Sequence, residues 1–117
     1  VLALLSRRVY TIERIKNLKL NAEKIFSKLK ITNIVTKYAD GNLGWKEQIP
    51  FDRIIFTAAT AKISNDIFMH IKEGGIIVSP MIRKNKQILV KFTKLDNQII
   101  DEEFDDVLFV PNLDNVQ

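Results

Sequence analysis

Two acidic residues lie where predicted β-strands end, and carboxylates at such positions can bind a nucleotide. Glu13 follows Val9–Ile12, a short β-branched and aromatic segment that predicts a buried strand. Asp40 precedes Gly41 in the loop after a second predicted strand, Ile31–Lys37. A carboxylate has two acceptor oxygens, so Glu13 could bind both hydroxyls of a ribose. Asp40 could accept a hydrogen bond from an adenine amino group.

Both acids also have a structural explanation, and the residues alone leave the choice open. Glu13 precedes a predicted helix, where a carboxylate interacts favourably with the helix macrodipole. Asp40 could instead cap its own turn. A third candidate position is Thr57–Ala59, which ends an apolar run, because ligands bind outside the carboxyl ends of the strands in open parallel sheets.

The elements that would position these residues alternate between strands and helices. Apolar residues recur at three- and four-residue steps over Ile15–Leu29, which predicts an amphipathic helix. The run Ile54–Ala59 is apolar on both faces, as in a central strand that helices cover on both sides. A second helix is predicted from its N-cap at Ser64 to a C-terminal glycine at Gly74. Its inward stripe is Ile63, Ile67 and Ile71.

Three further strands are predicted after this helix. They are Gly75–Pro80, Gln87–Thr93 and Phe104–Val110. An acidic turn around Asp96–Asn97 and the charged run Asp101–Glu103 separate the last two. The resulting order, β-α-β-β-α-β-β-β, predicts a parallel α/β beginning and a hairpin at the end.

The composition is that of one domain covering residues 1–117, with 46% apolar and 27% charged residues. No apolar run approaches the roughly 18 to 20 residues that cross a bilayer, so we expect no membrane association. The chain has no cysteine and one histidine, which excludes disulfides and thiolate nucleophiles and fits a cytoplasmic protein. We expect that histidine, His70, to be a partly buried structural residue.

Positive charge is concentrated in the first half of the chain. Residues 1–62 hold 12 Lys/Arg and 5 Asp/Glu, a balance of +7, whereas residues 83–117 hold 5 and 7, a balance of −2. The basic half could face phosphates or acidic peptides, and solvated helix faces explain it as well. We expect no nucleic-acid partner, because aromatic residues are not interleaved with the basic ones.

Four stretches of the sequence occur in the order and spacing seen in protein-L-isoaspartate O-methyltransferases, and the chain resembles that family throughout. They are Arg8–Arg14, Tyr38–Trp45, Pro50–Ala59 and Lys72–Pro80. The second contains D-G-x-x-G-W, and the third is built on F-D-x-I-x-x-T-A-A. The resemblance implies an α/β fold with a doubly wound, mostly parallel sheet of the S-adenosylmethionine-dependent methyltransferase type. It would be truncated at the N-terminus and would end in an antiparallel hairpin.

The resemblance also implies roles for individual residues. Glu13 would hold the ribose of S-adenosylmethionine, and Asp40 with Gly41 would contact the adenine. Thr57 and Ala58 match the strand end that lies by the methyl donor, although small residues there also suit tight helix–sheet packing. The implied reaction methylates the carboxylate of isoaspartyl residues in damaged proteins, which is a repair activity. It needs no general base, because a carboxylate is already ionised at pH 7.

Two departures from the family pattern affect these expectations. Met81-Ile82 follows Pro80 where the family usually has Val-Gly, which puts the local turn in doubt. The first strand and the glycine-rich turn that cradles the methionine end of the cofactor are expected upstream of Val1. Without that strand we expect closure of the two exposed strand edges, pairing in a homodimer, or complementation by a separate N-terminal fragment. The alternative to an enzyme is a catalytically incompetent fragment that serves as a binding or assembly module.

Overall fold

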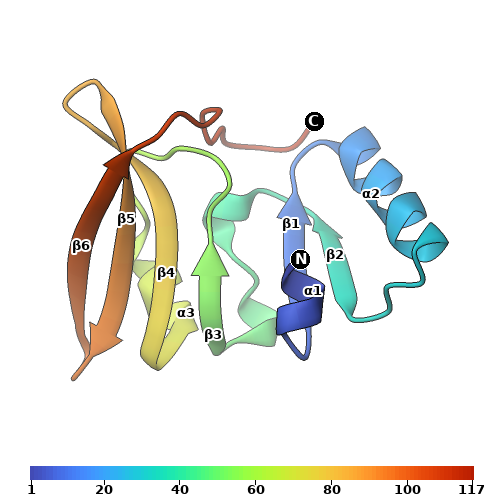
Figure 1. The fold of residues 1–117 in the computed structure, drawn as a ribbon, viewed down its shortest axis with the longest axis horizontal. Helices are drawn as coiled ribbons and strands as arrows, with labels where there is room; N and C mark the ends of the chain where they lie inside the picture. The colour runs from blue at the N-terminus through green and yellow to red at the C-terminus, as the bar shows by residue number, and fades with distance from the viewer. The chain divides into compact units, whose positions relative to one another are not determined.

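The computed structural model describes residues 1–117, and its strands form two separate sheets (Figure 1). The chain divides into two compact units. The first consists of Val1–Gly41 with Asp114–Gln117, and the second of Asn42–Leu113. None of the helices is both long enough and apolar enough to span a membrane.

The first unit is a parallel strand pair with one helix packed on it. Its elements in chain order are α1 (Leu2–Leu5), β1 (Val9–Glu13), α2 (Lys16–Lys28) and β2 (Ile34–Tyr38). The register places Val9 opposite Ile34 and Glu13 opposite Tyr38. The predicted strand–helix–strand order is therefore confirmed, with each boundary within a few residues of the expected one.

A carboxylate links the helix of this unit to its second strand. Glu23 on α2 accepts a hydrogen bond from Thr36 on β2, and Lys19, one turn earlier on α2, contacts the same oxygen at 2.5 Å. The hydrogen bonds from Lys19 and Thr36 lower the pKa of Glu23 below its ordinary value. This network orients α2 on the strand pair.

The second unit is a four-stranded mixed sheet with a short helix. Its elements are β3 (Phe51–Ile55), α3 (Asn65–His70), β4 (Ile71–Arg83), β5 (Lys86–Leu95) and β6 (Gln98–Asp106). The single-turn helices η1 (Gly41–Leu43) and η2 (Lys46–Gln48) precede β3. The strand order is β3-β4-β5-β6, with β3 parallel to β4 and the other two pairings antiparallel.

Two-residue turns with positive φ angles join the antiparallel strands. Lys84 and Asn85 connect β4 to β5, and Asp96 and Asn97 connect β5 to β6. Left-handed residues at both turn positions match the right-handed twist of the flanking strands. The expected acidic turn at Asp96–Asn97 is confirmed, and β4 runs straight through Met81 and Ile82. The family's glycine is therefore not needed at that position.

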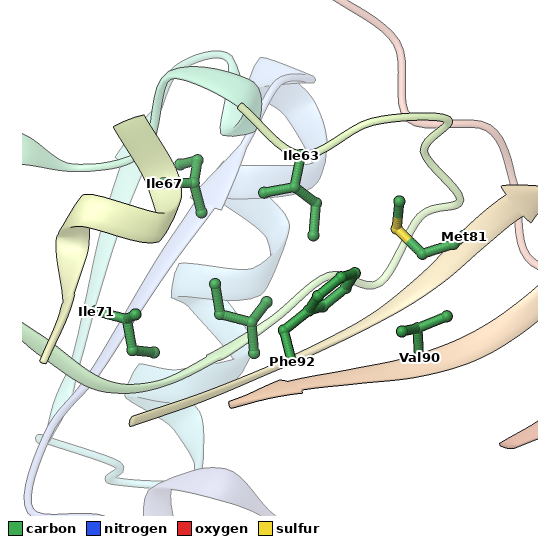
Figure 2. Close-up of a cluster of buried hydrophobic side chains, with 7 residues drawn as sticks. Ile63, Ile67, Ile71, Met81, Val90 and Phe92 are labelled. Carbon is green, nitrogen blue, oxygen red and sulfur yellow. The ribbon is translucent and has the colours of Figure 1, made fainter. Parts of the chain in front are cut away.

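The core of the second unit is a cluster of seven apolar side chains from α3, the loop before it, and strands β4 and β5 (Figure 2). Its members are Ile63, Ile67, Ile71, Ile77, Met81, Val90 and Phe92. Ser64 caps α3, because its side-chain oxygen accepts a hydrogen bond from the Ile67 amide. The predicted cap is therefore confirmed. The three residues of the predicted stripe are all buried, but only Ile67 lies on α3, since Ile63 precedes the helix and Ile71 belongs to β4.

The predicted end of the second helix is wrong. The helix ends at His70, and Ile71, which pairs with Phe51, already belongs to β4. The β3–β4 register is irregular between Phe51 and Arg53, and Gly74 lies on β4 opposite this irregularity with a φ of +75°. Gly74 thus allows the backbone conformation of an irregular strand pairing and does not end a helix.

Two predicted strands are displaced. The strand expected over Ile54–Ala59 is β3, Phe51–Ile55, after which the chain bends and rejoins β4 where Thr60 pairs with Met81. The last strand begins at Gln98 and ends at Asp106, so the charged run expected to be a connection lies within β6. All side chains of β6 are exposed, so burial of apolar residues does not explain this strand. Its backbone hydrogen bonds to β5 do.

The parallel strands do not form one continuous sheet. The strand β1 pairs only with β2, and β3 pairs only with β4, so each has one unpaired edge. The fold is a mixed α/β structure with a small parallel pair and a mixed four-stranded sheet.

Candidate functional site

The first unit brings the two candidate acids to the same end of its sheet, the end at which both strands finish. Glu13 is the last residue of β1 and lies opposite Tyr38, the last residue of β2. The Ala39 amide donates a hydrogen bond to the Glu13 carbonyl at 3.2 Å, and Asp40 follows immediately. Because the strands are parallel, both acids lie at the carboxyl end of the pair, where α/β proteins bind ligands.

The Glu13 side chain also positions the start of α2. Its Oε1 atom accepts a hydrogen bond from the Ile15 amide at 2.9 Å, directly before the helix begins at Lys16. Glu13 therefore has a structural role at the start of the helix. The bond from Ile15 is the only hydrogen bond that the structure gives the half-buried carboxylate, so Oε2 remains available as an acceptor.

Asp40 and Gly41 differ in what holds them. Asp40 Oδ2 accepts a hydrogen bond from the Asn115 amide at 2.9 Å. Gly41 has no positive φ angle, and a Cβ atom added to it would meet nothing within 4 Å. Neither backbone strain nor packing within the protein therefore requires a glycine there. The space beside its backbone is open.

The second glycine of the D-G-x-x-G-W stretch has a structural reason. Gly44 has a φ of +65°, and an added Cβ would lie 2.7 Å from His70 Nδ1 and 2.8 Å from Ile67 Cδ1. Only glycine fits both this conformation and this close approach. His70 itself is 5% exposed and its Nδ1 has no hydrogen-bond partner, so it is a buried residue of the second unit.

Thr57 and Ala58 lie in the bend after β3, in the second unit. Thr57 is exposed and Ala58 is half-buried. The next residue, Ala59, is 1% exposed, and its N–H and C=O bond to Val110 and Asn112 at 2.7 Å each. The packing explanation therefore applies to Ala59, and a role of Thr57 and Ala58 near a methyl donor stays a prediction.

The structure adds residues that the sequence did not single out. Arg14 follows Glu13, and the C-terminal residues Asp114–Gln117 bond to it and to Asp40 at the carboxyl end of β1 and β2. Arg14 belongs to one of the four stretches that carry the family resemblance. That membership is the one feature of the sequence that could have pointed to it. No local pattern links it to residues 101 positions away. No group of three or more His, Cys, Asp or Glu side chains could hold a metal ion.

Ligands of α/β proteins bind at the carboxyl ends of parallel strands, and in nucleotide-binding folds an acidic residue stands there. The protein-L-isoaspartate(D-aspartate) O-methyltransferase family matches residues 2–117, and the chain belongs to this family.

Curated relatives of the chain are bacterial protein-L-isoaspartate O-methyltransferases. The protein from Maricaulis maris is 46% identical over 111 residues, which are 95% of this chain and 52% of that protein. The protein from Helicobacter pylori strain J99 is 38% identical over 118 residues, which cover all of this chain and 56% of that protein. The chain thus spans about half the length of the curated relatives it matches.

Solved structures agree with this assignment. One protein-L-isoaspartate O-methyltransferase superposes with a TM-score of 0.83 at 24% identity over 89% of this chain and 33% of its own, which supports the fold. Another, a β-aspartate methyltransferase from Plasmodium falciparum in complex with S-adenosyl-L-homocysteine, gives 0.82 at 25% identity. It covers 92% of this chain and 53% of its own.

Proposed function

We propose that the chain carries the nucleoside-binding half of a protein-L-isoaspartate O-methyltransferase, which transfers a methyl group from S-adenosylmethionine to isoaspartyl residues in damaged proteins. The observation that carries this proposal is the meeting of Glu13 and Asp40 at one edge of a parallel strand pair, next to the open side of Gly41. The relatives named above support it, as does the neighbour solved with S-adenosyl-L-homocysteine.

The donor set of the first unit fits an adenosine. Glu13 Oε2 would accept hydrogen bonds from the ribose, and the Asp40 carboxylate would accept one from the adenine amino group. The open face of Gly41 leaves room for the base. In this proposal Thr57 and Ala58 contact the cofactor near its methyl group, as the family pattern implies.

The chemistry requires positioning rather than proton transfer. The cofactor supplies a methyl group on a positively charged sulfur, and the acceptor carboxylate is already ionised at pH 7. The protein therefore needs no general base, and holding the reactants in line can supply much of the acceleration. His70 is buried in the second unit, and this proposal gives it no part in the reaction.

The doubly wound sheet is part of the proposal. The unpaired edges of β1 and β3 would each accept a strand, supplied either by a second copy of the chain or by a separate N-terminal segment. The substrates would be proteins or peptides that contain isoaspartate. A second candidate is a binding or assembly module without catalytic activity.

Calorimetry with S-adenosyl-L-homocysteine tests the nucleoside site directly. We expect the chain to bind with a micromolar Kd and Asp40→Asn to weaken binding by roughly 10- to 100-fold, the usual loss for a charge-assisted hydrogen bond. Asp105→Asn is the matched control, because the Asp105 side chain is exposed and makes no hydrogen bond or ion pair in the structure. Absence of binding at millimolar ligand would refute the proposed function.

Activity separates the two candidates once binding is established. Transfer of a labelled methyl group to an isoaspartyl peptide, with the normal aspartyl peptide as control, would support the enzyme. Binding without transfer, even after a segment that completes the sheet is added, would support the non-catalytic module.

A further inference from the structure

The last residues of the chain run along the carboxyl end of β1 (Figure 1). The Gln117 amide donates a hydrogen bond to the Arg14 carbonyl at 2.7 Å, and the Gln117 carbonyl accepts one from the Lys16 amide at 2.9 Å. These two backbone bonds fix the end of the chain to the segment that joins β1 to α2. We call residues Asp114–Gln117 the C-terminal strap.

The Arg14 side chain holds the middle of the C-terminal strap. Its Nε atom donates to the Asn115 carbonyl at 2.8 Å, and Nη2 donates to the Asp114 carbonyl at 3.4 Å. A guanidinium is suited to this role, because its donors have a fixed planar arrangement that can bind two acceptors at once. The strap turns sharply here, since Asn115 has a φ of +64°, a conformation that asparagine tolerates.

This turn directs the Asn115 amide at Asp40, the residue that we propose binds the adenine. The amide donates to Asp40 Oδ2 at 2.9 Å and so fixes the orientation of that carboxylate. Arg14 thus acts on Asp40 through one intermediate residue, whose carbonyl it binds and whose N–H reaches the acid.

We propose that Arg14 is a positioning residue that determines base selectivity: it fixes the C-terminal strap, whose Asn115 N–H orients Asp40 toward the 6-position of a purine. This inference rests on the proposed function. An ionised carboxylate only accepts hydrogen bonds, so an oriented Asp40 favours a 6-amino purine and disfavours a 6-oxo purine. A carboxylate free to rotate discriminates less between the two.

The test compares two ligands that differ only at that position, S-adenosyl-L-homocysteine and S-inosyl-L-homocysteine. We expect the unmodified chain to prefer the adenosyl ligand by roughly tenfold or more, the order expected for one such hydrogen bond. Arg14→Gln should reduce this ratio several-fold. Arg14→Lys should restore part of it, because an ammonium group can still bind one carbonyl. Arg7→Gln is the charge-matched control and should leave the ratio unchanged, since Arg7 is exposed and bonds to nothing in the structure.

A second variant guards against a folding defect in Arg14→Gln. A chain that ends at Leu113 lacks the C-terminal strap and should show the same reduced ratio. Adding Arg14→Gln to the shortened chain should then change nothing further, because both changes remove the same interaction. An unchanged ratio in both single variants, or equal weakening of both ligands in each, would overturn the positioning role.

Failure of the proposed function would appear differently, as an unmodified chain that binds neither ligand. In that case the positioning role can be tested without a ligand. The measurement is the NMR chemical shift of the Asn115 amide as the pH falls through the range in which carboxylates titrate. A shift that follows protonation in the unmodified chain, and that is lost in both Asp40→Asn and Arg14→Gln, supports it. The same shift in Arg14→Gln as in the unmodified chain overturns it.

Discussion

Glu13 and Tyr38 are register partners at the carboxyl end of a parallel strand pair. This pairing places the two candidate acids, Glu13 and Asp40, at the same end of the sheet. Asp40 follows two residues after Tyr38, and the Ala39 amide between them is bonded to the Glu13 carbonyl. The two acids are therefore held by backbone hydrogen bonds rather than by long flexible loops, which favours a preorganised site.

Replacing Glu13 should affect ligand binding more than stability. In Glu13→Gln the amide oxygen can still accept the bond from the Ile15 amide, so α2 should begin at the same residue. The charge that we propose binds the ribose hydroxyls is lost, and we expect S-adenosyl-L-homocysteine to bind roughly 10- to 100-fold more weakly. Calorimetry measures this effect, with circular dichroism as a check on the fold. Unchanged affinity would exclude Glu13 from the nucleoside site.

Replacement by alanine should affect stability very differently at the two glycines, Gly41 and Gly44. Gly41→Ala places its Cβ in open space without backbone strain, so the free energy of unfolding should change by less than about 1 kcal/mol while ligand affinity falls. Gly44→Ala forces a left-handed alanine against His70 and should cost about 1 to 3 kcal/mol or more. Urea denaturation measures both. A marked loss of stability in Gly41→Ala alone would contradict the distinction.

The core of the second unit should be sensitive to truncation at Ile77. This side chain is 1% exposed within the cluster of seven, and Ile77→Ala should destabilise the protein by about 2 to 5 kcal/mol. Ile55→Ala removes the same atoms from a side chain that is 54% exposed, and should cost less than about half as much. Equal shifts of the urea midpoint in the two variants would show that the cluster is not the core.

The Glu23 network should make stability depend on pH in the acid range. Hydrogen bonds from Lys19 and Thr36 lower the pKa of Glu23 in the folded state below its unfolded value. Its contribution is therefore fully present above the ordinary carboxyl range and is lost as the pH falls through the lowered value. Glu23→Gln should differ from the unmodified chain in urea midpoint at pH 6, and the difference should shrink toward pH 3. A difference that is constant with pH would contradict this.

The sequence predicted local features well where one pattern dominated. The strand ending at Glu13 and the cap at Ser64 follow from short-range chemistry, and both are present. Ile71 satisfies the spacing of a helical stripe and of a buried strand equally. Its pairing with Phe51 and its burial decide for the strand, which no local pattern could show.

Long-range pairing explains the other differences between expectation and structure. The acidic run in β6 has no apolar alternation, and it becomes a strand because β5 supplies its hydrogen bonds. The link from Arg14 to Asn115 joins opposite ends of the chain, so only a three-dimensional structure reveals it. The candidate acids, by contrast, lie at a strand end or within two residues of one, so the order of the predicted strands is enough to locate them.

The acidic character of β6 has a consequence for how the protein associates with itself. Five of the nine residues of this outermost strand are Asp or Glu, and all nine are exposed. Two copies that met along β6 would bring like charges face to face, which opposes open-ended stacking of sheets into fibrils. Growth of the four-stranded sheet is thus opposed at β6, and ordered self-assembly is left to the unpaired edges of β1, β2 and β3.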